Sequence, residues 1–151
     1  MGFARILVCV DGSESSATAA DYAIEMARKH GSHVIALNVI VSQLAYAYSS
    51  GAFGLATSGA INDILEKSKQ EAKKWFDDIE KKAAAQGVQV KTEIVASPTS
   101  VVPAIVEYAE KNKADLIVTG TKGRSGFTKL LLGSVASGLV TYATCPVMVV
   151  K

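Results

Sequence analysis

Five short apolar runs, separated by segments with helical periodicity, organise the chain. They cover residues 4–10, 34–41, 88–95, 116–119 and 146–150. All but the third are almost continuously apolar, which is typical of strands buried on both faces of a parallel sheet. The third alternates in part between apolar and polar positions, so we expect one side of that strand to be less covered.

Between these runs, apolar residues recur every three or four positions, as on the buried face of a helix. Helices are expected from a cap at Ser13 or Ser15 to His30, and over residues 62–86, 101–113 and 127–143. Alternating strands and helices require right-handed crossovers and a covered parallel sheet. We therefore predict one α/β domain over residues 1–151, a three-layer α/β/α arrangement with a five-stranded parallel sheet of Rossmann-like type.

The second long helix carries the single tryptophan. Trp75, Phe76 and Ile79 fall on one face, and lysines and acids alternate on the other. A Trp beside a Phe can form a ligand box, but helical spacing indicates core residues. The balanced charges indicate a solvated face.

Residues 41–60 are unusually free of charge, and no charged residue occurs between Val34 and Ile61. A membrane-spanning helix would need a longer unbroken apolar stretch, whereas polar residues and glycines interrupt this one. We expect a long loop that acts as a lid or contact surface. Its candidate contacts are Tyr46, Tyr48, Phe53 and Leu55.

The composition restricts the possible partners. The chain has 151 residues, 49% hydrophobic and 20% charged, with a formal net charge of +2. It lacks the basic stripe that phosphate-mediated nucleic-acid binding needs. The amino-terminal apolar run is too short for a signal peptide, so a cytoplasmic protein is expected, with no membrane partner.

The sequence offers no metal site built from side chains. Cys9 and Cys145 form no CxxC pair, and each lies in or beside a strand, which indicates small buried residues. His30 and His33 have no further His or Cys cluster near them.

The densest candidate chemistry lies in residues 116–134, which read LIVTGTKGRSGFTKLLLGS. A strand enters a loop with Gly120, Gly123 and Gly126, and a helical pattern follows. Glycines leave room for backbone N–H groups to approach an anion, and a helix start adds partial positive charge. Lys122 and Arg124 add full charges, so this stretch predicts a phosphate site.

This loop matches neither common phosphate-binding fingerprint. GxxxxGK[ST] is absent, and the GxxGxxG spacing after the fourth strand differs from the dinucleotide pattern. Ligands of open parallel sheets bind at the carboxyl ends of strands, where Asp11 and Val39 also lie. Asp11 could accept from a ribose or base, or only cap a helix. Val39 could meet adenine through its backbone, or only fill the core.

With these residues, the chain resembles the universal stress protein family, in its ATP-binding branch. GTKGRSGFTKLLLGS fits that family's G-x2-G-x9-G-[ST] motif, and ILVCVDGS, LNVI, ADLIVTGTKGRSG and TCPVMVV extend the similarity over nearly the whole chain. The resemblance implies an adenine nucleotide alpha hydrolase-like fold with strand order 3-2-1-4-5. It also implies a stress or signalling role, homodimers and bound ATP, with Mg²⁺ possible beside the nucleotide.

The resemblance also implies a set of nucleotide-binding residues. Asp11 would meet the adenosine, Val39 the adenine, and Gly120, Gly123 and Gly133 would shape the phosphate cradle. The complete expected set is Cys9, Val10, Asp11, Val39, Thr119, Gly120, Lys122, Gly123, Arg124, Gly133, Ser134 and Val135.

Three functions remain open on the sequence. The leading one is a nucleotide-binding stress or signalling module without a catalytic residue. The second is a slow ATPase or autophosphorylating enzyme, for which the loop lacks a general base. The third is a nucleotide-independent interaction or chaperone-like protein that uses residues 41–60.

The implied strand order bears on the cysteines and on assembly. The strands of Cys9 and Cys145 would be two spacings apart, roughly 10 Å, which is too far for a disulfide. The last strand would be an apolar edge. Pairing with a second copy would cover it, so we expect a homodimer through Val147–Val150.

Overall fold

Five parallel strands form a single sheet in the computed structural model, which describes residues 2–49, 58–121 and 132–151. Their order is β3-β2-β1-β4-β5, as the family resemblance implied. The strands are β1 (Arg5–Cys9), β2 (His33–Val41), β3 (Val90–Ser97), β4 (Leu116–Gly120) and β5 (Val147–Val150). The chain therefore has the predicted α/β fold, and the strand order reverses between β1 and β4.

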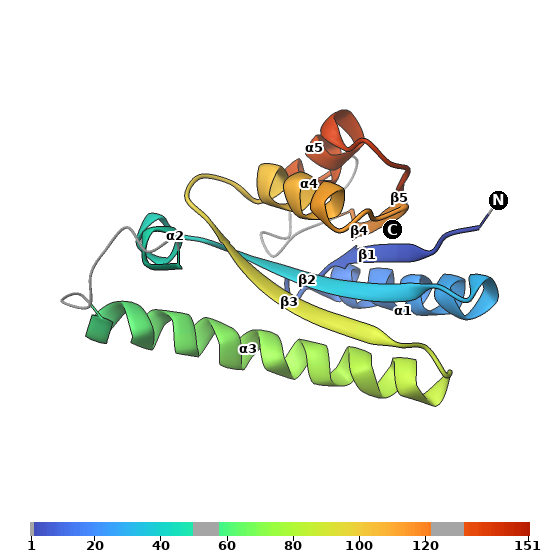
Figure 1. Ribbon diagram of the computed structural model, residues 1–151, viewed down its shortest axis with the longest axis horizontal. Helices are drawn as coiled ribbons and strands as arrows, with labels where there is room; N and C mark the ends of the chain where they lie inside the picture. Colours follow the sequence, from blue (N-terminus) through green and yellow to red (C-terminus); the bar gives the residue numbers. More distant parts are fainter. Residues whose placement is uncertain (1, 50–57, 122–131) are drawn as a thin grey trace.

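Helices cover both faces of the sheet (Figure 1). On one face lie α1 (Glu14–His30) and α3 (Ser58–Ala85), and on the other α4 (Val101–Lys111) and α5 (Ser134–Tyr142). Successive side chains of β1 serve the two cores: Ile6 and Val8 pack towards α1 and α3, whereas Leu7 packs towards α4. This explains why the first strand is continuously apolar from Ile6 to Val8.

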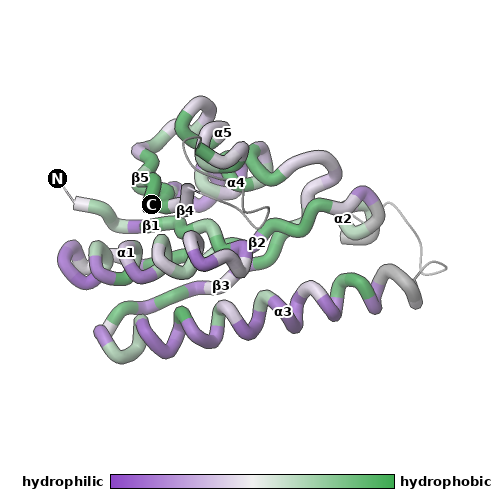
Figure 2. Tube along the Cα trace, turned by 180° about the vertical axis from the view of Figure 1, so that it is seen from behind, coloured by the Kyte–Doolittle hydropathy of each residue, from purple (hydrophilic) through white to green (hydrophobic). Residues whose placement is uncertain are grey.

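The third strand is less covered on one side, as its pattern predicted. Val90 and Ile94 pack against the core beneath α1 and α3. Lys91 and Glu93 alternate with them and form an ion pair of 3.3 Å with largely exposed side chains. The tube in Figure 2 shows apolar residues along β1 and β2, and polar residues predominating along α3.

The long helix α3 bears out the core interpretation of its aromatic residues. Phe76 and Ile79 are buried, and Trp75 packs half-buried against the same cluster. The opposite face carries exposed ion pairs such as Lys73 with Asp77 at 2.9 Å.

The long loop expected at residues 41–60 is partly helical, so that prediction was wrong for its first part. Residues 43–49 form α2 (Gln43–Ser49). Ser42 begins the helix, because its hydroxyl accepts from the N–H of Ala45 and its carbonyl accepts from the N–H of Tyr46. Tyr46 is exposed. Phe53, Leu55 and the side chain of Tyr48 lie outside the described residues.

Three helix boundaries also differ from prediction by two or more residues. The helix α3 begins at Ser58 rather than at residue 62. The helix α5 begins at Ser134, after Gly133, whose N–H donates to the carbonyl of Thr121; residues 127–131 of the predicted helix lie outside the described residues. The helix α4 ends at Lys111, since Lys113 has a left-handed backbone with φ of 54°.

Within the described ranges, no helix is long and apolar enough to cross a membrane. The same residues contain no group of three or more His, Cys, Asp or Glu side chains that could hold a metal ion. Both cysteines are free, as predicted.

Candidate functional site

A pocket of about 130 Å³ lies where the carboxyl ends of β1, β2 and β4 meet the first turn of α5. This is the point at which the strand order reverses, the usual ligand position in open α/β sheets. Nine of the twelve residues predicted for a nucleotide line it: Cys9, Val10, Asp11, Val39, Thr119, Gly120, Gly133, Ser134 and Val135. Lys122, Gly123 and Arg124 lie outside the described residues, so their positions stay predictions.

The loop after β1 holds Asp11 at the pocket. The N–H of Ser13 donates to Asp11 Oδ1 at 2.9 Å, and Ser13 Oγ accepts from the N–H of Ser16 at 3.1 Å. Ser13 is therefore the cap of α1, and Asp11 forms the turn before it. One carboxylate oxygen is thus held in place, which leaves the other available to a ligand.

Gly12 is required in this loop for two reasons. Its φ is +82°, in the region that favours glycine, and a Cβ there would lie 2.3 Å from Cζ2 of Trp75. The indole of α3 therefore packs directly on the loop that carries Asp11. Trp75, which its helical spacing identified as a core residue, therefore also packs against the loop of the pocket.

Seven lining residues were missed by the sequence analysis, and two of them, Asn38 and Ser16, are buried polar residues. Asn38 is buried in β2, and its Nδ2 donates to the carbonyl of Val10 at 2.7 Å. Ser16 is buried in α1, and its hydroxyl donates to the carbonyl of Ser13. The available signal for Asn38 was a lone amide within an otherwise apolar strand, since a buried polar side chain needs a specific partner.

Asn38 extends the contact between β1 and β2 beyond the end of their ladder. The last paired residues are Cys9 and Leu37, after which the N–H of Val10 donates to the carbonyl of Leu37 at 2.8 Å. The amide of Asn38 then binds the Val10 carbonyl. The N–H and the carbonyl of Val10, the residue before Asp11, are therefore both hydrogen-bonded to β2.

Gly120 has a packing role in addition to the one expected. A Cβ at this position would lie 1.9 Å from Oγ of Ser15 and 2.8 Å from its carbonyl carbon. The glycine therefore allows the end of β4 to pack against the start of α1. It shapes the pocket by close approach of two backbones, and its own backbone is not in the left-handed region.

The chain closes on itself beside the pocket. The N–H of Gly133 donates to the carbonyl of Thr121 at 2.7 Å, so the residues that flank the segment 122–131 meet at its base. This places both ends of the glycine-rich stretch at the pocket, although the residues between them are not described.

The first turn of α5 presents backbone donors to the pocket. Its N-cap is Gly133, which has no side chain to cap the helix. The N–H groups of Ser134, Val135 and Ala136, all pocket-lining residues, have no partner within the helix. Together with the helix dipole they form a suitable site for a negatively charged group.

Cys9 lines the adenine side of the predicted site but is a poor nucleophile. Burial raises the pKa of its thiol to about 12, and the negative charge of Asp11 adds to this rise, while a hydrogen bond with Thr119 opposes it. A thiolate is the reactive form of cysteine. Cys9 is therefore a polarisable wall of the pocket rather than a reactive group.

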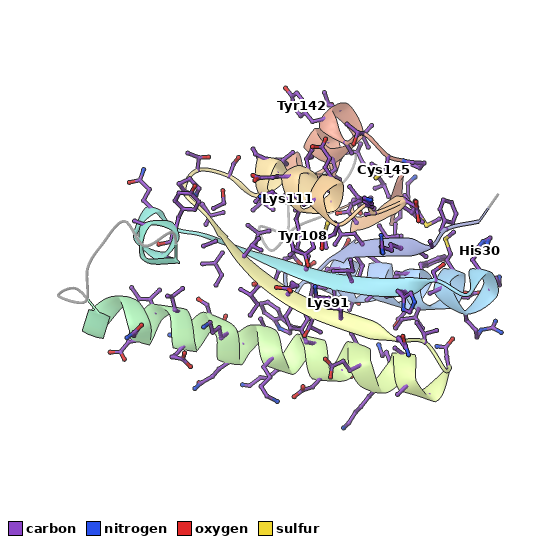
Figure 3. All side chains as sticks on the ribbon, in the orientation of Figure 1. His30, Lys91, Tyr108, Lys111, Tyr142 and Cys145 are labelled. Atoms are coloured by element: carbon purple, nitrogen blue, oxygen red, sulfur yellow. The ribbon has the colours of Figure 1, made fainter. Side chains whose placement is uncertain are left out.

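We expect thiol labelling to distinguish the two cysteines. At pH 8 a thiol with a pKa near 12 is about one part in ten thousand thiolate, so Cys9 should react very slowly. Cys145 lies just before β5 (Figure 3), and burial raises its pKa as well, but it is less enclosed. Iodoacetamide followed by peptide mass spectrometry should find label on Cys145 first. Equal labelling of both would contradict the raised pKa of the Cys9 thiol.

The chain matches the model described as the universal stress protein family over residues 2–151. It is 40% identical over 152 residues to Universal stress protein MJ0531 of Methanocaldococcus jannaschii, covering 99% of this chain and 82% of that protein. The structure of the universal stress protein UspA from Lactobacillus plantarum superposes with a TM-score of 0.82 at 27% identity, covering 100% of this chain and 99% of that one.

Three further structures share the fold and are described with a bound nucleotide. A universal stress protein in complex with cAMP has a TM-score of 0.67 at 24% identity, covering 100% of this chain and 98% of that one. A universal stress protein from Archaeoglobus fulgidus in complex with dAMP has a TM-score of 0.68 at 23% identity, covering 100% of each chain. A universal stress protein family protein from Arabidopsis thaliana with AMP bound has a TM-score of 0.67 at 19% identity, covering 98% of this chain and 91% of that one.

Proposed function

The chain belongs to the universal stress protein family, and from this premise we propose that it binds an adenine nucleotide, ATP in particular, in a stress-response or signalling role. The proposed site is the pocket at the carboxyl ends of β1, β2 and β4. The observation that carries the proposal is that three separate stretches meet at one pocket. They are the loop after β1 that carries Asp11, the end of β2 and the start of α5. We propose that residues 1–151 act as one domain in the cytoplasm.

The chemistry of the pocket divides into two ends. Cys9, Val10 and Val39 offer apolar surface and strand backbone suited to a flat base, and Asp11 offers an acceptor for its amino group or for a ribose hydroxyl. At the other end, the uncapped start of α5 offers N–H donors and the Ser134 hydroxyl to phosphate. Lys122 and Arg124 would add positive charge beside it.

The nucleotide-bound relatives support the nucleotide class but not its details. Their ligands, cAMP, dAMP and AMP, share an adenine and a phosphate. Because these proteins are less than 25% identical to this chain, their similarity shows a shared fold and nothing finer. The choice of ATP therefore depends on the resemblance of the glycine motif to that of the family's ATP-binding branch.

Mg²⁺ would enter with the phosphates rather than through a preformed side-chain site. Among the described residues, Asp11 is the one carboxylate that lines the pocket, and its position is at the adenosine end. A cation there would be held chiefly by phosphate oxygens and by water, as Mg²⁺ commonly is.

Calorimetry with ATP, AMP and cAMP tests the proposal directly, together with mass spectrometry of nucleotide released from denatured protein. The proposal predicts saturable binding of at least one of them, with ATP the tightest. Absence of both binding and released nucleotide would refute it. Steady release of ADP from bound ATP would instead favour the slow ATPase, for which the described pocket residues supply no histidine base.

We also propose a homodimer through β5. In the β4–β5 pair, the carbonyls of Pro146 and Val150 accept from β4 and its extension, which turns the backbone groups of Val147 and Val149 outward. An apolar strand with outward N–H and C=O groups is a template for pairing with a second chain.

Replacing Val149 with proline should give a monomer, because proline removes an outward N–H without breaking the inward bonds to β4. Size-exclusion chromatography with light scattering measures the change, and Val149→Ala, which keeps the N–H, is the control. Nucleotide affinity should stay within about twofold. A dimer that persists in the proline variant would place the interface elsewhere.

A further inference from the structure

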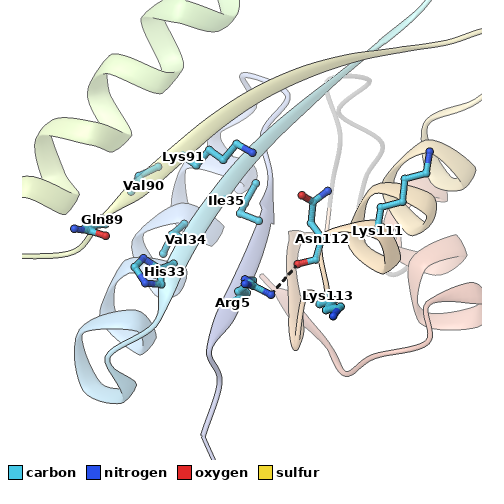
Figure 4. A pocket seen from close by; sticks show the side chains of 10 residues that line it. All are labelled: Arg5, His33, Val34, Ile35, Gln89, Val90, Lys91, Lys111, Asn112 and Lys113. Carbon is cyan, nitrogen blue, oxygen red and sulfur yellow. Dashed lines mark hydrogen bonds between the residues drawn. The ribbon is translucent and has the colours of Figure 1, made fainter.

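A second cavity, of about 810 Å³, lies at the opposite end of the strands from the nucleotide pocket (Figure 4). It is formed by the beginnings of β1, β2 and β3 and by the carboxyl end of α4. Its lining residues are Arg5, His33, Val34, Ile35, Gln89, Val90, Lys91, Lys111, Asn112 and Lys113. We call it the basic groove, because every lining side chain that can carry a charge is basic.

Composition does not account for this concentration of basic residues. The whole chain has 16 Lys and Arg against 14 Asp and Glu. Among the described residues, the groove is lined by three lysines, an arginine and a histidine, and by no carboxylate. The lining itself is therefore positively charged, and the nearest acids lie outside it.

The acids nearest to the groove leave these cations available. Lys91 pairs with Glu93 at 3.3 Å and Lys111 with Glu107 at 2.9 Å, both with exposed lysine side chains. Exposed pairs of this kind are weak, so either lysine can turn to a stronger anion. For Lys113, no ion pair occurs within the part of the chain that the structure describes.

Asp115, a further acid beside the groove, is already engaged. One of its oxygens accepts from the backbone N–H groups of Ala4 and Arg5, both at 2.8 Å. The guanidinium of Arg5 donates to the carbonyl of Asn112 at 3.5 Å, towards the end of α4. Arg5 lines the groove, and its guanidinium has further N–H donors that can bind an anion.

Lys113 occupies a backbone position that is normally reserved for glycine. The N–H of Lys113 donates to the carbonyl of Glu110, and that of Ala114 to the carbonyl of Ala109. The end of α3 has the same pair of hydrogen bonds, with Gly87 at the matching left-handed position. A lysine at such a position is less stable than a glycine, and strain of this kind concentrates at binding sites.

We propose that the basic groove binds an acidic segment of a partner protein. Figure 4 shows Lys91 from β3 and Lys111 from α4 on opposite sides of Arg5, so the charges are spread along the groove. Spread, flexible ammonium groups suit successive carboxylates of an extended chain, whereas one compact anion needs converging donors. The side-chain amide of Gln89 can bind the peptide backbone, whereas that of Asn112 already donates to the carbonyl of Tyr108 at 2.9 Å. This proposal does not depend on nucleotide binding.

Fluorescence anisotropy of a labelled Glu-rich peptide, titrated with the full chain at low salt, tests the groove. The peptide should bind, its affinity should fall as salt is added, and a peptide with Gln in place of Glu should not bind. The triple variant Lys91→Gln, Lys111→Gln, Lys113→Gly should weaken binding by about tenfold or more. The matched control Lys67→Gln, Lys74→Gln, Lys81→Gln on α3 should change it by less than about twofold.

The single variant Lys113→Gly separates binding from structure. It should raise the melting temperature by roughly 2–4 °C, because the strain is relieved, while it weakens peptide binding. An unchanged affinity in the triple variant, or an equal loss in the α3 control, would overturn the proposal. Binding of tripolyphosphate without binding of the peptide would overturn it too, since the groove would then be a small-anion site.

Discussion

Replacing Gly120 with valine is expected to lower the free energy of unfolding by about 3 kcal/mol or more and to remove nucleotide binding with it. A side chain at this position would meet the backbone of Ser15, whose carbonyl carbon would lie 2.8 Å from the new Cβ. Backbone cannot rotate away as a side chain can, so β4 or α1 must move. Residues of both elements line the pocket, so their displacement would disrupt the nucleotide site together with the core.

Thermal unfolding measures this effect, and a lowering of the melting temperature by roughly 10 °C is expected. Gly59→Ala is the matched control, because Gly59 lies in α3 with open space around it and alanine there should preserve or increase stability. The double variant Gly120→Ala with Ser15→Gly separates two clashes. If removal of the Ser15 hydroxyl restored full stability, the clash would be with that side chain and not with the backbone.

Replacing Ser134 with proline should abolish most phosphate binding while the fold is preserved. Ser134 is the first residue of α5, where proline fits a helix, and Gly133 has φ of −56° and ψ of 160°, which a following proline allows. The change removes the Ser134 N–H and its hydroxyl, two donors at the proposed phosphate end. The loss should be about 3 kcal/mol, or about a hundredfold in Kd for ATP.

The control for this variant is proline at the first position of α1. Ser13 has φ of −74° and ψ of 158°, so Glu14→Pro is equally compatible with its helix, and Glu14 does not line the pocket. Calorimetry with ATP and adenosine should show a loss for ATP in Ser134→Pro and little change for adenosine. An equal loss for adenosine would mean that the start of α5 does not face the phosphates.

The two cavities are connected by one helix. Val101 and Ile105, in the first half of α4, line the nucleotide pocket, whereas Lys111 at its end lines the basic groove. In a parallel sheet, crossover helices run opposite to the strands, so the two ends of α4 lie at opposite ends of the strands. The proposed nucleotide site and the proposed partner site therefore lie at opposite ends of the sheet and share this helix.

The sequence by itself determined the strands, most of the helices and the candidate residues of the site. Continuous apolar runs such as that around Leu7 identify strands buried on both faces, and helical spacing identified Phe76 as core, because each pattern depends on local geometry. The end of β1, the end of β2 and the start of α5 could be marked as candidates for the same reason, since each lies at a recognisable strand end or helix start.

Only the tertiary structure decided how those places meet and what some of the residues do there. Gly120 was predicted to shape a phosphate cradle, and the structure shows that it also admits Ser15, which lies more than a hundred positions earlier in the chain. Asn38 binds Val10, and Lys113 has a left-handed backbone at the edge of a groove formed by three strands. Periodicity and spacing describe neighbours along the chain, whereas these roles depend on contacts between distant segments, which exist only once the sheet has formed.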